Sequence, residues 1–246
     1  MHPYSPPNDL LRERVILVTG AGAGLGRAAS LAFAGHGATV ILLGRTQARL
    51  EQVYDEIAAA GGPTPLLMPA DLAKCSLAEH EHIAASIEKQ FGRLDGLLHS
   101  AATLGHLAPL EHYGLEEWAQ VMQVNLNAAY LLTRTCLNAL KAAPEASVIF
   151  TTSDVARQGR AYWGAYALAG AALENLARIW ADELSENTQI RVNSLDPGAV
   201  RPALRARAYP GEDPKTLPQP HEVMGMYLYL MGPDSRGVSG QALHAQ

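Results

Sequence analysis

Two hydroxyl side chains that could exchange protons with a bound molecule stand thirteen positions apart in the second half of the chain. Ser153 follows a predicted strand, and Tyr166 lies near the start of a predicted helix. A tyrosine hydroxyl can act as a general acid or base, and a serine hydroxyl beside it can hydrogen-bond an oxygen of the reacting molecule. Each residue also has a simple structural interpretation, Tyr166 as a half-buried helix residue and Ser153 as a turn residue. Asp154 could contact a substrate or cap a turn.

A glycine-rich segment near the N-terminus is typical of a phosphate-binding turn. Segment 19–26 has the sequence TGAGAGLG, and it stands between a predicted buried strand and a predicted helix. Glycines let the backbone turn sharply and approach a pyrophosphate, and the N-terminus of the helix directs N–H groups and a positive dipole toward the phosphates. The residues predicted to bind a dinucleotide here are Thr19, Gly20, Gly22, Ala23, Gly24, Leu25 and Gly26.

The end of the second predicted strand indicates which dinucleotide the turn prefers. NAD-binding folds commonly place Asp or Glu on the ribose about twenty residues beyond the glycine turn. Here Gly44 stands at that position, and Arg45 and Thr46 follow it. The missing carboxylate removes a repulsion, and a guanidinium can pair with a 2′-phosphate. The sequence therefore favours NADP(H), with NAD(H) as the second choice. The alternative is that Arg45 is a solvated residue at the start of a helix.

The elements that must position these residues alternate along the whole chain. Strands are predicted over 15–19, 38–43, 64–68, 94–99, 147–151, 190–195 and 241–244, and helices over 25–34, 46–60, 76–91, 115–141, 162–185 and 221–231. Continuous apolar strands that alternate with helices are typical of a parallel sheet covered on both faces. We therefore predict one α/β domain over 1–246, a doubly wound Rossmann-type sheet of about seven strands. Residues 1–12 form an N-terminal extension, and 201–220 a loop that covers the substrate.

Composition argues against several classes of protein. The 246 residues are 48% hydrophobic and 17% charged with a net charge of −5, so no basic surplus indicates nucleic acid or an anionic membrane. No apolar run reaches the ~18–20 residues of a membrane span, and the N-terminus does not resemble a secretory signal. Cys75 and Cys136 are predicted to be buried thiols, which fits a cytoplasmic protein. His80 and His82 are predicted to be solvated, and no metal site is predicted.

With these features in place, the chain resembles the short-chain dehydrogenase/reductase family along nearly its whole length. The spacing of Thr19, Gly20, Gly24 and Gly26 is that family's version of the turn, and Ser153 and Tyr166 have its common catalytic spacing. Segments 157–167 and 227–232 are most similar to a bacterial branch of the family, the YciK-like oxidoreductases. The resemblance implies hydride transfer between nicotinamide and the carbon of a small carbonyl or alcohol substrate.

The resemblance also assigns roles to residues that spacing alone does not identify. It implies that Tyr166 exchanges the hydroxyl proton, that Ser153 holds the substrate oxygen, and that Asn125 is the structural and catalytic asparagine. It implies a homodimer or homotetramer built through two long helices, although a buried intramolecular face would explain the alanine-rich helix equally well. The remaining residues that it adds to the cofactor site are Asp71, Leu72, Ala101, Pro197, Gly198 and Val200.

The chain departs from the family pattern around the nicotinamide half of the site. The family's tyrosine is followed four residues later by a lysine, and here that position is Gly170. Residues four apart share a helix face, so the absent cation would have lain beside Tyr166 and lowered its pKa from about 10. Segment 99–102 reads His-Ser-Ala-Ala instead of Asn-Asn-Ala-Gly, and Pro202 replaces a common threonine. Arg157, Arg160 or Arg201 could supply the missing charge.

Two functional interpretations follow from this mixture. In the first, the protein is an NADP(H)-dependent oxidoreductase with weakened activity that favours reduction near neutral pH, because a high pKa keeps the tyrosine protonated. In the second, it is a non-catalytic NADP(H)-binding protein, a sensor or partner subunit that kept the fold. The retained Asn125, Ser153 and Tyr166 favour the first, whereas Gly170, Ala102 and Pro202 favour the second.

Overall fold

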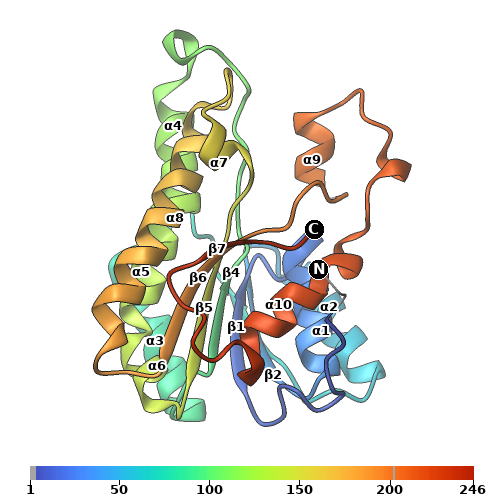
Figure 1. Cartoon of the computed structure of the whole chain (residues 1–246), viewed down its shortest axis with the longest axis vertical. Coiled ribbons are helices and arrows are strands. Elements are labelled where there is room, and N and C mark those ends of the chain that lie inside the picture. The colour runs from blue at the N-terminus through green and yellow to red at the C-terminus, as the bar shows by residue number, and fades with distance from the viewer. Residues whose placement is uncertain (1–3, 202) are drawn as a thin grey trace.

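A parallel sheet of seven strands forms the centre of the molecule (Figure 1). The computed structural model describes residues 4–201 and 203–246. The spatial order is β3-β2-β1-β4-β5-β6-β7, so the chain reverses direction across the sheet between β1 and β4. This is the predicted doubly wound Rossmann-type fold. The strands are β1 (Val15–Thr19), β2 (Thr39–Gly44), β3 (Leu66–Pro69), β4 (Gly96–His99), β5 (Ala146–Thr151), β6 (Ile190–Asp196) and β7 (Ala242–His244).

Helices cover both faces of this sheet, as Figure 1 shows. Successive strand side chains point to opposite faces, so Ile16 packs in one core and Leu17 in the other. On the Ile16 face lie α1 (Gly24–Gly35), α2 (Gln47–Ala59) and α10 (Met224–Met231). On the Leu17 face lie α3 (Leu77–Phe91), α5 (Ala128–Thr135), α6 (Leu137–Ala142) and α8 (Gly164–Ser185), with α4 (Leu115–Met122) packed on α8.

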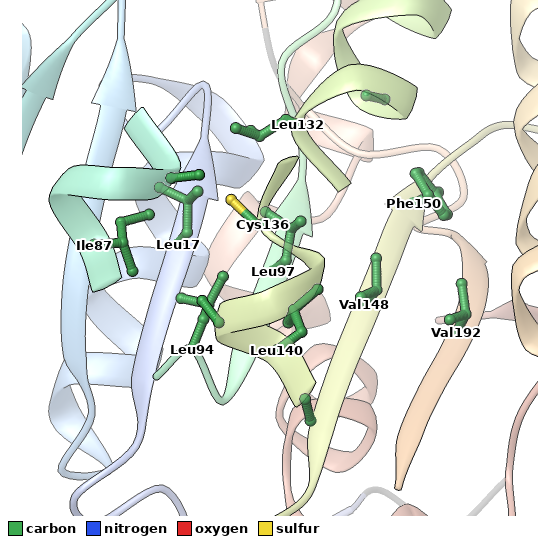
Figure 2. Close-up of a cluster of buried hydrophobic side chains, with 14 of the residues drawn as sticks. Leu17, Ile87, Leu94, Leu97, Leu132, Cys136, Leu140, Val148, Phe150 and Val192 are labelled. Atoms are coloured by element: carbon green, nitrogen blue, oxygen red, sulfur yellow. The ribbon is translucent and has the colours of Figure 1, made fainter. Parts of the chain in front are cut away.

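Figure 2 shows the core on the Leu17 face, where strand and helix side chains meet. Leu97 and Val148 from the sheet lie among Leu132 and Leu140 from the helices, and all four are at most 1% exposed. Full burial of each such side chain is worth about 1.5–3 kcal/mol. Cys136 lies within this core as a buried free thiol, as predicted.

The predicted helix 115–141 is interrupted twice. A π-helical turn, Gln123–Asn127, separates α4 from α5, and α5 ends before Cys136. At this turn the side chain of Asn125 forms two hydrogen bonds with the main chain of Thr103. Its Oδ1 accepts the Thr103 N–H at 2.8 Å, and its Nδ2 donates to the Thr103 carbonyl at 2.9 Å. Apolar periodicity continues across such a turn, so the sequence pattern did not reveal the break. π-Turns commonly occur at functional sites.

Two other predicted segments differ from the structure. Segment 201–220 is not a plain loop, because it contains α9 (Ala203–Ala208) and a short 3₁₀ turn, Pro214–Thr216. Predicted helix 221–231 begins as a 3₁₀ turn, Pro220–Val223, and becomes α-helical only at Met224. Within the predicted N-terminal extension, Leu10 and Leu11 are buried in the Ile16-face core, so residues 10–11 belong to the folded domain.

The prediction that His80 and His82 are both solvated was wrong for His80. Its side chain is fully buried in α3 beside Ile83 and Ile87, while His82 points to solvent. Both ring nitrogens of His80 lack a hydrogen-bond partner. Burial lowers the pKa of His80 because the charged imidazolium would lose its hydration. In the part of the chain that the structure describes, no helix is long and apolar enough to cross a membrane.

Candidate active site

A cleft of about 460 Å³ opens at the carboxyl ends of the strands. Ligands of open α/β sheets bind there, at the point where the strand order reverses, which in this sheet lies between β1 and β4. The turns after β1, β2, β3, β4, β5 and β6 all contribute lining residues. The cleft therefore brings together segments that are far apart in the sequence.

The glycine turn after β1 leaves no room for side chains. A Cβ on Gly20 would lie 2.9 Å from the Cα of Ala101, and one on Gly26 would lie 2.3 Å from the carbonyl oxygen of Gly20. Gly20 also has a positive φ of 68°, which favours glycine. Gly22, Ala23, Gly24 and Leu25 line the cleft at the start of α1. That start has no side-chain cap and no acidic residue in its first turn, so the turn fits a phosphate group.

Two arginines line the cleft beyond the glycine turn. Arg45 and Thr46 follow β2 as predicted, and Arg49 joins them from the first turns of α2. The Cβ of Arg49 packs over Gly22, 3.0 Å from where a Cβ on that glycine would be. Arg49 was not predicted; it is the third residue of α2, whereas Arg45 lies before the helix begins. Two guanidinium groups suit a doubly charged phosphate ester.

Several predicted cofactor residues lie behind the cleft surface. The Oγ1 of Thr19 accepts hydrogen bonds from the backbone N–H groups of Ser100 and Ala101, at 3.0 and 3.1 Å. Thr19 is 1% exposed, so it joins the ends of β1 and β4 rather than lining the cleft. Gly26 packs beneath the turn against Gly20. Asp71, Leu72 and Ala101 do line the cleft, and Asp71 accepts the backbone N–H of Ala73 at 3.2 Å.

Ser153 and Tyr166 face the cleft together at its other end. Ser153 follows β5, and Tyr166 lies in the first turn of α8. Burial raises the pKa of the Tyr166 hydroxyl; the Ser153 hydrogen bond lowers it, and the carboxylates of Asp196 and Asp154 raise it further. Asn125 does not line the cleft. It holds Thr103, which does.

Gly170 lies one turn after Tyr166 on α8. A Cβ at this position would lie 3.0 Å from the Cβ of Ala156 in α7 (Val155–Gln158). The short helix α7 therefore packs over the place where a longer side chain at 170 would begin. His99, another departure from the family, is buried and stacks on Phe150 with ring centroids 4.8 Å apart. Burial lowers its pKa to about 3, so its ring is neutral.

The three arginines that the sequence offered as a substitute for the lysine expected at position 170 are engaged elsewhere. Arg157 bonds Glu174 and Asp196, Arg160 donates to the Tyr209 hydroxyl at 2.7 Å, and Arg201 donates to the Pro214 carbonyl at 2.5 Å. None of them contributes to the pKa shift of Tyr166. Within the described residues, no basic side chain is among the groups that shift the pKa of Tyr166.

The loop after β6 forms the wall beside Tyr166. Pro197, Gly198 and Val200, which the sequence analysis assigned to the cofactor site, line the cleft. Gly198 has a positive φ of 75°, and its N–H donates to Asp196 Oδ1 at 2.9 Å. The Gln246 amide donates to the Pro197 carbonyl at 3.0 Å.

The outer end of the cleft combines apolar and aromatic side chains with two arginines of α9, Arg205 and Arg207. Trp163, Leu204, Ala208 and Tyr209 line it together with Leu104. Segment 201–220 thus lies against the cleft through α9. This aromatic wall was not predicted, because α9 and the start of α8 meet only in the folded chain. Pro202, another predicted departure, lies outside the described residues.

Comparison with known proteins agrees with this geometry. The family model described as short chain dehydrogenase matches residues 14–213, so the chain belongs to the short-chain dehydrogenase family. The uncharacterized oxidoreductase YciK of Escherichia coli K12 is 44% identical over 246 residues, which is 100% of this chain and 96% of that protein. The solved structure of a Pseudomonas syringae relative, 51% identical, has a TM-score of 0.98 and covers 100% of both chains. An Escherichia coli CFT073 relative, solved with NADPH, is 44% identical, with a TM-score of 0.95 over 98% of this chain and 100% of that chain.

Proposed function

We propose that this protein is an NADP(H)-dependent oxidoreductase that interconverts a carbonyl compound and its alcohol. The observation that carries the proposal is the cleft that joins the glycine turn, Arg45 with Arg49, and the Ser153–Tyr166 pair. The NADPH found in a relative that is 44% identical supports the choice of cofactor. The family itself supports the class of reaction.

Each part of the cleft then has a distinct role. Gly20, Gly22 and the start of α1 would hold the pyrophosphate, and Arg45 with Arg49 the 2′-phosphate. The bound nicotinamide would supply or take up the hydride. Ser153 would hydrogen-bond the substrate oxygen, and the Tyr166 hydroxyl would donate its proton to that oxygen as the carbonyl is reduced. Asn125 would act indirectly, by fixing Thr103 in the cleft wall.

Cofactor choice can be tested by titration with NADPH and NADH, following quenching of the three tryptophans. We expect NADPH to bind more tightly, because NADH offers the arginines no 2′-phosphate. A hydrogen bond to a charged group is worth about 1.5–3 kcal/mol, so Arg45→Gln should weaken NADPH binding about 10-fold or more and leave NADH binding unchanged. Arg178→Gln, at an exposed position of α8, is the control. Equal affinity for the two nucleotides would contradict the assignment.

A non-catalytic NADP(H) binder is the second candidate function. The observation that favours it is Gly170 packed under Ala156, which leaves Tyr166 without a neighbouring cation. Binding measurements cannot separate the two candidates, because both hold the nucleotide. Consumption of NADPH that depends on an added carbonyl compound separates them.

We further propose that the protein forms a homodimer or homotetramer through its long helices. Tyr130 in α5, together with Leu168 and Ile179 in α8, is 42–49% exposed. Closed symmetric assemblies are the usual outcome when one subunit presents such a surface. Light scattering on the purified protein would show a mass of two or four chains; a monomer at micromolar concentration would contradict the proposal.

A further inference from the structure

An arginine whose side chain is 30% exposed links the helix that carries Tyr166 to the end of strand β6. Arg157 Nη1 lies 2.6 Å from Glu174 Oε1, and its Nη2 lies 2.6 Å from Asp196 Oδ2. The side chains of Glu174 and Asp196 are 5% and 4% exposed. Glu174 stands two turns after Tyr166 on α8, and Asp196 is the last residue of β6. The two arms of one guanidinium therefore hold two different elements.

Asp196 also connects Arg157 to the cleft wall. Its Oδ2 bonds Arg157, while its Oδ1 accepts the N–H of Gly198 at 2.9 Å. Gly198 lines the cleft between Pro197 and Val200. A continuous chain of contacts thus runs from α8 through Glu174, Arg157 and Asp196 to this loop. We call these three side chains the α8–loop link.

The link also reaches the segment that carries Ser153. Thr152 Oγ1 donates to Glu174 Oε1 at 3.2 Å, and Thr152 directly precedes Ser153 in the chain. His244 Nδ1 lies 3.4 Å from Asp196 Oδ2 at the open side of the link. Two buried carboxylates that share one guanidinium are a costly way to stabilise a fold, since apolar side chains of the same size commonly do as well or better. What fixed charges and hydrogen bonds do supply is a defined geometry.

The loop held by this link lines the cleft between its two ends. A nucleotide with its pyrophosphate at the glycine turn that extends to Ser153 and Tyr166 would lie beside the wall formed by Pro197, Gly198 and Val200. We propose that Arg157 is a positioning residue for hydride transfer, which acts through Glu174 and Asp196 to fix this loop against the helix of Tyr166. The inference rests on the proposed function.

Ligand fragments can test this role without any turnover. NADPH reaches the loop, whereas 2′-phospho-ADP-ribose lacks the nicotinamide and occupies only the glycine-turn half. We expect Arg157→Met to weaken NADPH binding at least tenfold and to change the affinity for 2′-phospho-ADP-ribose less than twofold. Arg93→Met is the matched control, because it removes an ion pair to the buried Asp95 just before β4, at the end of the sheet away from the cleft; it should leave both affinities unchanged.

Two further variants separate positioning from general stability. Asp196→Asn keeps an oxygen for the Gly198 N–H and leaves the Arg157–Glu174 pair intact, but it presents an amide to the guanidinium. It should reproduce the selective loss of NADPH affinity, and it decides the question if Arg157→Met does not fold. Arg157→Lys keeps the positive charge but loses the two separate Nη donors of the guanidinium. Its NADPH affinity should lie between those of Arg157→Met and the unmodified protein.

The outcomes distinguish this inference from the proposed function. Equal weakening of both ligands, or unchanged NADPH affinity in Arg157→Met and Asp196→Asn, would overturn the positioning role alone. A selective loss in a protein that reduces no carbonyl compound would support the link and overturn the catalytic proposal. Failure of the unmodified protein to bind either ligand would overturn both.

Discussion

Tyr166 is surrounded by groups that oppose its ionisation. Its ring is partly buried, and burial is the largest cause of its raised pKa, because the phenolate would lose hydration. Asp196 and Asp154 add negative charge nearby, while the Ser153 hydrogen bond acts in the opposite direction. The residue one turn later, Gly170, carries no charge. The hydroxyl is therefore protonated at neutral pH.

The direction of the reaction should follow from this protonation state. Reduction needs the proton on Tyr166, whereas oxidation needs the tyrosinate. Because the pKa of Tyr166 is raised, the reduction rate should be flat between pH 6 and 9, and the oxidation rate should rise about tenfold per pH unit. Initial rates of NADPH consumption and NADP⁺ reduction on one carbonyl–alcohol pair would measure this. An oxidation rate at pH 7 equal to the reduction rate would contradict it.

Residue types and spacing predicted which side chains face the cleft better than they predicted which act indirectly. Arg45, Ser153 and Tyr166 could be placed because each follows a predicted strand or begins a predicted helix. Thr19 and Asn125 could not be separated from them, because their hydrogen bonds to the backbone at residues 100, 101 and 103 form only when distant segments meet.

The contact between α7 and α8 decides what position 170 can hold. A glycine inside a helix costs about 1 kcal/mol relative to alanine, and here it gives the close packing of Ala156. A lysine at 170 therefore needs space as well as charge. Removing the Ala156 methyl would provide that space.

This packing makes a paired substitution informative. In Ala156→Gly/Gly170→Lys, a cation one turn from Tyr166 should lower its pKa by about 1–3 units. We expect oxidation at pH 7 to rise about tenfold or more over the Ala156→Gly variant, measured as NADP⁺ reduction. Gly170→Lys alone should gain less and be less stable. Ala156→Gly/Gly170→Met is the control for bulk; the same gain in that variant would show that charge is not the cause.

Elements with strong periodicity were predicted within a few residues, and those shaped by tertiary contacts were not. The β1–α1 unit agrees closely because its pattern is local. The π-turn at 123–127 and helix α9 were missed, since one depends on the bonds of Asn125 to Thr103 and the other packs with Trp163 and Tyr209. Both missed elements contribute to the cleft wall, the π-turn through Val124 and α9 through Leu204 and Ala208.

The molecule separates chemistry from stability between the two ends of its sheet. The cleft lies at the carboxyl ends of the strands, whereas Glu145 lies at the opposite end, before β5. Glu145 contacts Arg14, and lies 3.4 Å from Arg191 and 2.8 Å from Arg236. Burial alone would raise its pKa, but the Arg236 hydrogen bond and the charges of Arg14 and Arg191 outweigh that and lower it.

Removal of Glu145 should therefore affect stability but not the site. Glu145→Ala leaves the buried Arg191 without its carboxylate, so the free energy of unfolding should fall by about 3 kcal/mol. Because the folded-state pKa of Glu145 is lowered, its contribution is present above the unfolded-state value of about 4.3 and is lost as pH falls through the folded value. Urea unfolding at pH 7 and pH 3 would show a smaller difference between variant and parent at pH 3. A parallel loss of NADPH affinity would contradict the separation.

Carbonyl reduction by this protein is tested most directly by NADPH consumption with a panel of aldehydes and ketones at pH 7, for the unmodified protein and for Tyr166→Phe. General acid catalysis typically contributes about 10²–10⁴-fold. We expect carbonyl-dependent consumption that Tyr166→Phe reduces by about 100-fold or more while NADPH affinity is unchanged. A protein that binds NADPH but consumes none with any carbonyl, or a Tyr166→Phe variant as active as its parent, would contradict it.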